Sequence, residues 1–131
     1  AGTSKVLLKA EKILPIKAGH YIGNGVYARE DFIAARPELV QDLIGSIVEA
    51  IDFILANEEE AVKMWAKQIG FPEEVIRFAL SEKISVYNRD VAPEASTIEA
   101  YTKFLKDADI LKPDDNPKFD DSFAKKALAS K

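Results

Sequence analysis

The longest regular pattern of apolar and polar positions runs from Asp31 to Asn57. Apolar side chains recur there at steps of three and four residues, the period that places one wide stripe along an α-helix. Pro37 suits a first helical turn, because its missing N–H leaves no bond unmade, and Glu38 complements the positive end of the helix dipole. We predict one long amphipathic helix opened by Arg36-Pro37-Glu38. Its predicted apolar face consists of Val40, Leu43, Ile44, Ile47, Val48, Ile51, Ile54 and Leu55.

Two shorter stretches ahead of this helix predict strands. Val6–Leu8 is the centre of an apolar run typical of a buried strand. The segment Tyr21–Tyr27 is rich in β-favouring side chains, but glycines inside and beside it weaken a regular ladder and indicate a bulge or a bend. We predict a bent strand there that leads directly into the long helix.

The remainder of the chain predicts further helices. Asn57 and Glu60 form a capping-box pattern, and Gly70 is typical of a left-handed helix end. These residues predict a second helix, with Val62, Trp65, Ala66 and Ile69 on its buried face. The other predicted segments are a third helix from Phe71 to about Lys83, an extended piece at Ile84–Tyr87, a fourth helix from Ser96 or Thr97 to Ala108, and a last helix from Asp120 or Asp121 to Leu128.

This order of elements predicts an α/β chain with one or two strands followed by four or five helices. Two strands alone form a marginal sheet with open edges. The simplest explanation is that the missing strands come from another stretch of polypeptide. We therefore expect residues 1–131 to be a single partial domain.

The amino-acid composition argues against several classes of function. The net charge of −4 and the scattered lysines argue against a nucleic-acid surface. The chain has no cysteine, which excludes disulfides, thiolate nucleophiles and cysteine metal ligands. With a single histidine, a zinc site is not expected. The sequence also carries no phosphate loop, dinucleotide fingerprint or nucleophile elbow, and we predict neither an enzyme nor a bound cofactor.

Several segments in order resemble one family. An apolar strand is followed by Gly25–Phe32 (Gly-Val-Tyr-Ala-Arg-Glu-Asp-Phe) and Arg36–Val40 (Arg-Pro-Glu-Leu-Val). Later come Glu49-Ala50, the stretch from Ala56 to Ala61, the glycine-ended helix at Gly70, and a helix from Thr97 to Leu111 that ends before a Lys-Pro loop. Together, from about Val6 to Leu128, the chain resembles the C-terminal part of ABC-transporter solute-binding proteins of the nitrate/sulfonate/taurine type.

The resemblance implies a fold and a function. Family members are two-lobed, with a type II periplasmic-binding-protein-like fold that holds the ligand in a cleft between α/β lobes. This chain would be the C-terminal segment of the substrate-binding component of an ABC importer for a small anion such as a sulfonate, taurine or nitrate. Its expected partner is the membrane permease, and its expected location is periplasmic or extracellular, with a possible lipid anchor on the full-length protein. An isolated piece is expected to self-associate or exchange strands through its open edges.

The glycine-rich segment from Gly19 to Gly25 is the candidate ligand site. Glycine allows backbone N–H groups to face an anion, and His20, Tyr21 and Asn24 supply side-chain donors. We therefore predict these three residues as ligand contacts. The alternative interpretation is a hinge or loop with a surface histidine.

Other residues have simpler explanations. Met64 and Trp65 suggest an aromatic box, although Trp65 lies on the helical period typical of a core residue. Arg29 and Arg36 are candidate anion partners, but Arg29 precedes two acids that explain it equally well. The acid run Glu58–Glu60 is typical of helix-dipole partners.

Two other functions remain open alternatives. Thiamine-pyrimidine synthase-like enzymes share the family fold, but the cofactor-bearing lysine and reactive histidine that they need have no assignable counterpart in this sequence. A purely helical interaction domain is the third hypothesis, and it predicts a monomer without a sheet.

Overall fold

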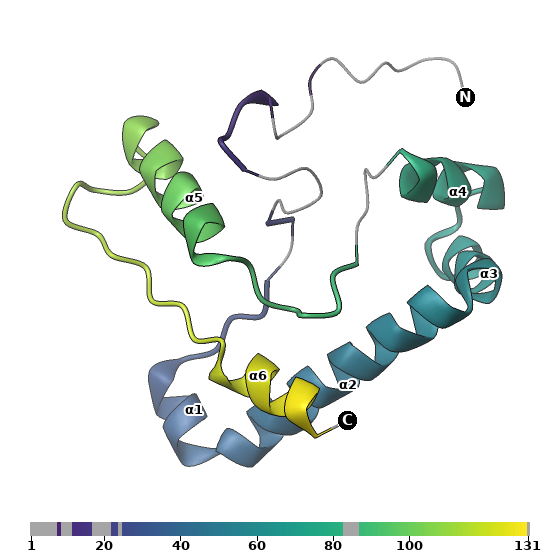
Figure 1. Ribbon diagram of the computed structural model, residues 1–131, viewed down its shortest axis with the longest axis horizontal. Coiled ribbons are helices and arrows are strands. Elements are labelled where there is room, and N and C mark those ends of the chain that lie inside the picture. The colour runs from purple at the N-terminus through teal and green to yellow at the C-terminus, as the bar shows by residue number, and fades with distance from the viewer. Residues whose placement is uncertain (1–7, 9–11, 17–21, 24, 83–86, 131) are drawn as a thin grey trace. The chain divides into compact units, whose positions relative to one another are not determined.

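The computed structural model describes residues 8, 12–16, 22–23, 25–82 and 87–130 of the chain. The described residues form helices only, and no strand occurs among them (Figure 1). None of these helices is long and apolar enough to span a membrane. The helices are α1 (Glu30–Ala35), α2 (Pro37–Ala56), α3 (Glu58–Ile69), α4 (Glu73–Ser81), α5 (Ala95–Asp107) and α6 (Ser122–Ala129).

The chain divides into two compact units. The first comprises Ala1–Val26 and Pro93–Phe119 and contains α5. The second comprises Tyr27–Ala92 and Asp120–Lys131 and contains the other five described helices. Each unit is described by itself below.

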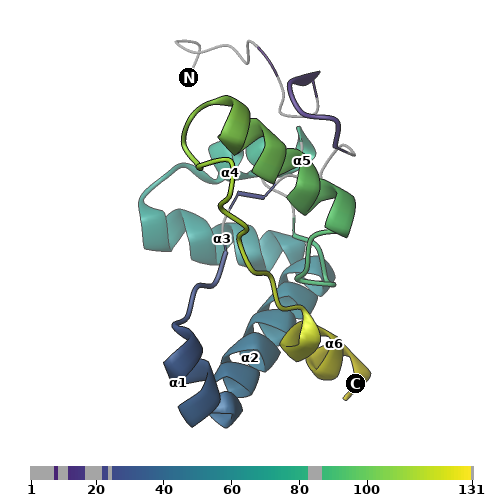
Figure 2. The same cartoon turned by 90° about the vertical axis from the view of Figure 1, so that its left-hand side faces the viewer.

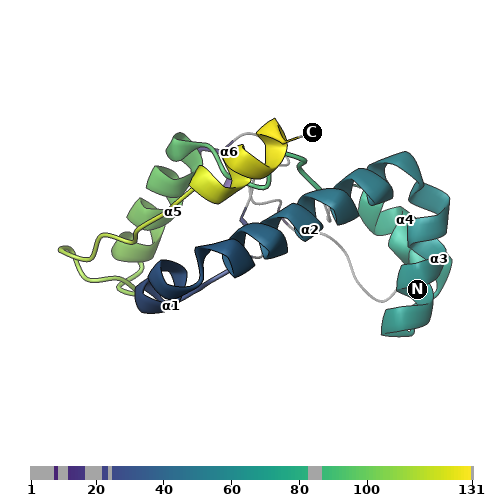
Figure 3. The ribbon, with the colours of Figure 1, turned by 90° about the horizontal axis from the view of Figure 1, so that it is seen from below.

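The predicted long helix is confirmed over Pro37–Ala56, but the residues before it form a separate helix (Figure 3). A proline disfavours the helical conformation of the residue that precedes it. Arg36 accordingly leaves the helical region, with φ −141° and ψ 52°. Its backbone N–H still bonds to the Phe32 carbonyl, so α1 ends there and α2 begins one residue later.

The core of the second unit lies along α2. Helix α6 packs beside α2 in both views (Figures 1 and 2). Val40, Val48 and Ile51 of α2 are buried, as are the small residues Ala124 and Ala127 of α6, which permit a close approach of the two helices. Leu43 and Leu55 belong to the predicted apolar face but are exposed.

The successive helices α3 and α4 pack against each other as a helical hairpin. Gly70 ends α3 with φ 73°, which confirms the left-handed end predicted from the sequence. Val62 and Ile76 are buried in the hairpin, whereas Ile69, predicted on the buried face of α3, is exposed. On the surface, Arg77 of α4 binds Glu59 of α3.

Helix α5 of the first unit ends in a Schellman motif. Asp109 takes a left-handed conformation with φ 55°. The Ile110 N–H bonds to the Leu105 carbonyl at 2.9 Å, and the Asp109 N–H bonds to the Lys106 carbonyl at 3.0 Å. Both bonds satisfy carbonyls at the end of the helix.

The α/β expectation is wrong for the described residues. Ile22, Gly23 and Gly25–Tyr27 lie in the predicted bent strand but form no strand, and neither does Leu8 of the first predicted strand. A strand needs a neighbouring strand to bond its backbone groups, and no such neighbour lies within the described ranges. Leu8 and Tyr27 are exposed rather than buried. The rest of both predicted strands, and residues 84–86, lie outside the described residues.

Candidate functional site

The predicted ligand contacts His20, Tyr21 and Asn24 all lie outside the described residues. In the described part of their segment, Ile22 forms a hydrogen bond with α5. The backbone N–H of Ile22 donates to the Tyr101 hydroxyl of α5 at 3.1 Å. This bond joins residues 79 positions apart within the first unit. It joins Ile22 to α5, and the ligand contacts themselves remain a prediction.

Arg29, one of the two candidate anion partners, is engaged with its neighbour. Its Nε donates to Asp31 Oδ1 at 2.9 Å and its Nη2 donates to Oδ2 at 2.6 Å. This two-point ion pair, with help from the Phe32 backbone N–H, holds the pKa of the Asp31 carboxyl below its usual value. The ion pair with Asp31 therefore accounts for Arg29 without an anionic ligand. Arg36 is exposed at the break between α1 and α2.

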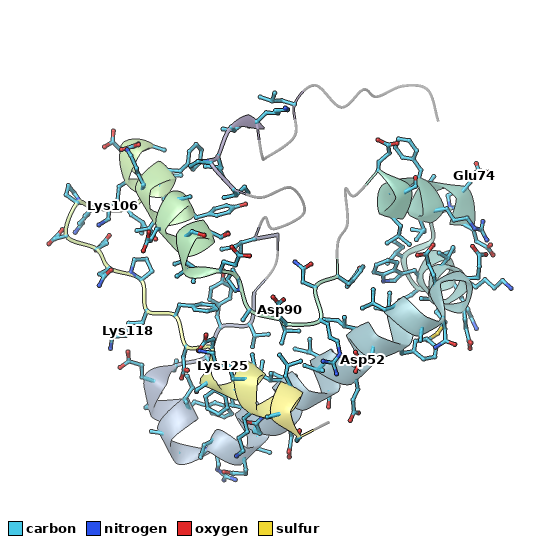
Figure 4. The ribbon with its side chains drawn as sticks, in the orientation of Figure 1. Asp52, Glu74, Asp90, Lys106, Lys118 and Lys125 are labelled. Atoms are coloured by element: carbon cyan, nitrogen blue, oxygen red, sulfur yellow. The ribbon has the colours of Figure 1, made fainter. Side chains whose placement is uncertain are left out.

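Tyr87 and Arg89, which follow α4 in the sequence, contact α3 and α2 respectively. Arg89 Nε donates to Asp52 Oδ1 of α2 at 2.7 Å, and Asp52 projects from the helix in Figure 4. The Tyr87 ring lies 5.1 Å from the Trp65 ring, with a tilt of 48° between the planes. Trp65 is half-buried against this ring, whereas Met64 is exposed, so these two residues form no shared aromatic box.

The acid run Glu58–Glu60 opens α3, as predicted for dipole partners. Glu59 has an additional role, because Arg77 donates to both of its carboxylate oxygens, at 3.1 and 2.8 Å. The same guanidinium binds Glu73 at 2.7 Å. These contacts lower the pKa of Glu59 and raise that of Arg77. Within the part of the chain that the structure describes, no three histidine or acidic residues are grouped to hold a metal ion.

A shallow groove of about 500 Å³ lies between α2 and α6 in the second unit. The Gln41 side chain joins the two helices, because its Nε2 donates to the Phe123 carbonyl at 3.1 Å. The Gln41 Oε1 atom is buried and has no hydrogen-bond partner. The groove is lined by Pro37, Glu38, Gln41, Asp42, Ser122, Phe123 and Lys126.

Sequence reasoning did not find this groove. Gln41 lies at the edge of the apolar face of α2, and a polar residue in that position is a weak signal for a contact between helices. Its partner Phe123 lies 82 positions away. A single sequence carries no information that pairs two helices over that separation.

Comparisons of the chain with protein-family models, with curated proteins and with solved structures found no match.

Proposed function

We propose that the chain is part of the substrate-binding component of an ABC importer for a small anion, located in the periplasm or outside the cell. One observation carries the proposal: two of the ordered motifs that resemble this family coincide with helix boundaries. Arg36–Val40 spans the start of α2, and Gly70 ends α3. The helix expected to reach Leu111, directly before Lys112-Pro113, ends earlier, at Asp107 of α5.

The agreement of boundaries supports the proposal because each motif has a mechanical reason for its place. Proline fixes the first turn of α2, and glycine accepts the left-handed conformation at the end of α3. The bent strand expected at Tyr21–Tyr27 does not form among the described residues, so the helix boundaries alone support the proposal. The proposed ligand contacts are His20, Tyr21 and Asn24, whose N–H and O–H groups are suited to an oxyanion such as a sulfonate or nitrate.

Isothermal titration of the full-length protein with taurine, a linear alkanesulfonate and nitrate tests the proposal. We expect one of these anions to bind. We expect Tyr21→Phe to weaken that binding roughly tenfold, the usual effect of removing one hydrogen bond to a charged ligand. Tyr27→Phe is the matched control, because Tyr27 is 89% exposed, and it should leave the affinity unchanged. Absence of heat with every anion would contradict the proposal.

A helical interaction domain is the second candidate, and it is favoured by the purely helical structure of the described residues. The two candidates differ in solution behaviour. A self-contained helical domain should be a monomer in size-exclusion chromatography with light scattering. A piece of a larger binding protein should form dimers or aggregates, because its apolar faces lack their normal cover. A well-behaved monomer that binds no anion would favour the second candidate.

A further inference from the structure

Helix α2 carries an exposed row of apolar and small side chains. Leu39, Leu43 and Phe53 are 48%, 49% and 39% exposed. Ser46 and Ala50 lie between them on the same line and are also exposed. The spacing of four, three, four and three residues keeps all five side chains on one narrow strip of the helix. At 1.5 Å per residue, the strip is about 21 Å long.

This exposed row borders the buried side of the same helix. Val40, Val48 and Ile51 are buried on the side that packs in the second unit, where α6 lies along α2. The apolar arc of α2 is therefore wider than the part that its neighbours in this unit cover. An uncovered apolar row of this length on one helix is characteristic of a helix-in-groove or helix-on-helix contact.

A line of carboxylates follows the polar edge of the row. Glu38, Asp42 and Glu49 are all exposed, and they lie within about 40° of one another around the helix axis, at 100° per residue. None of the three forms an ion pair within the described residues, where Arg89 and Arg77 bind other carboxylates. The row therefore has one apolar strip and one acidic edge without an ion pair, although Glu38 and Asp42 share a groove with Lys126 of α6.

We propose that this α2 surface is a docking site for a basic amphipathic segment of a partner protein, with apolar side chains that cover the row and Lys or Arg residues that face the acidic edge. Charge complementarity selects this occupant. In an antiparallel symmetric contact, a second copy of the chain would bring two acidic edges together. An anionic lipid surface would be repelled by the same carboxylates. The inference uses exposure and charge alone and does not depend on the proposed transport function.

Fluorescence anisotropy with designed peptides tests the proposal. The probe is an 18-residue helical peptide with leucines at steps of four and three residues and lysines along one flank. The matched peptide has glutamate at every lysine position. We expect the lysine peptide to bind with an affinity that falls as salt rises, and the glutamate peptide to bind at least about tenfold more weakly. Equal binding of both peptides, or no binding of either, would overturn the proposal.

Variants of the chain locate the contact. Leu43→Ser should weaken binding of the lysine peptide about tenfold, whereas the control Met64→Ser, at an exposed residue of α3, should leave it unchanged. The double change Asp42→Asn with Glu49→Gln should flatten the salt dependence. Circular dichroism checks that each variant keeps its helix content. If Leu43→Ser and Met64→Ser have equal effects on binding, α2 is not the docking site.

Discussion

At the residue scale, Val91 has the least favourable backbone conformation among the described non-glycine residues. Its φ is 44°, in the left-handed region that β-branched residues avoid because Cβ crowds the following carbonyl oxygen. Neighbouring contacts hold it there. The Val91 N–H bonds to the Asn88 carbonyl at 3.2 Å, and Arg89 binds Asp52 at 2.7 Å.

Replacement of Val91 by asparagine should therefore stabilise the chain. Asparagine adopts the left-handed conformation more readily, so we expect Val91→Asn to raise the free energy of unfolding by about 1 kcal/mol. Urea denaturation measures this change. A loss of stability would show that the half-buried valine side chain contributes more by packing than its backbone costs.

Two glycines provide a matched pair of tests. Apart from its own neighbours along the chain, a Cβ atom added at Gly45 or at Gly70 would meet no atom within 4 Å, so each substitution reports mainly on the backbone conformation. Gly45 lies inside α2, where Gly45→Ala should stabilise by about 0.5–1 kcal/mol. Gly70 has φ 73°, and Gly70→Ala should destabilise by about 1 kcal/mol. Effects of the same sign in urea denaturation would contradict the assigned conformations.

Asn57 shows what local sequence patterns can and cannot predict. The capping-box pattern correctly predicted that α3 begins after Asn57, but the predicted capping hydrogen bond is absent. Instead, the Asn57 side-chain amide donates to the Phe53 carbonyl at the end of α2 at 3.0 Å. Asn57 is the single residue between α2 and α3. Its side chain can therefore form a hydrogen bond either with the end of α2 or with the start of α3. The pattern alone does not decide between them.

At the scale of elements, a surface charge cluster joins α3 and α4 and responds to acid. Arg77 lowers the pKa of Glu59 from its usual value of 4.5. A carboxyl with a lower pKa in the folded state stabilises fully above its unfolded-state pKa, and this stabilisation is lost as pH falls through the folded-state pKa. The contribution of Glu59 should therefore be present at pH 7 and be lost as the pH falls through its lowered folded-state pKa.

The variant Glu59→Gln tests this dependence. We expect it to lower the urea midpoint at pH 7 slightly, since the pair is solvent-exposed and screened by salt. The difference from the unmodified chain should shrink as the pH is lowered and the Glu59 carboxyl becomes protonated. Glu58→Gln is the control, because Glu58 opens the same helix without binding Arg77. Equal effects of the two variants would attribute the change to the helix dipole rather than to the ion pair.

Helices were predictable from the sequence, and strands were not. The spacing of Val40, Ile44, Val48 and Ile51 in α2 repeats locally, so one sequence contains the whole signal. A strand forms only when a distant segment supplies its hydrogen-bond partners. The β-favouring residues Ile22 and Val26 lie without such a neighbour among the described residues, and the Ile22 N–H bonds to Tyr101 instead. Residue preference alone therefore overpredicted the sheet.

At the scale of the whole molecule, part of the candidate site lay beyond sequence reasoning. The contact between Gln41 and Phe123 depends on how two helices pair, which no local pattern encodes. The sequence predicted a wide apolar face on α2, and that face is wider than one neighbouring helix can cover. In the structure, the exposed apolar residues of α2 include Leu43, which belongs to the predicted face, and Leu39 and Phe53, which do not. The account of this protein therefore rests on an uncovered flank of α2.

Thiol labelling measures the cover of this flank directly, because the chain contains no cysteine. Leu43→Cys and Val48→Cys place single thiols on opposite sides of the apolar arc of α2, at positions 49% and 0% exposed. The account predicts that the thiol at position 43 reacts with a disulfide reagent at nearly the rate of an unfolded control. The thiol at position 48 should react only when the chain opens. Equal protection of both thiols in the native chain would contradict the uncovered flank.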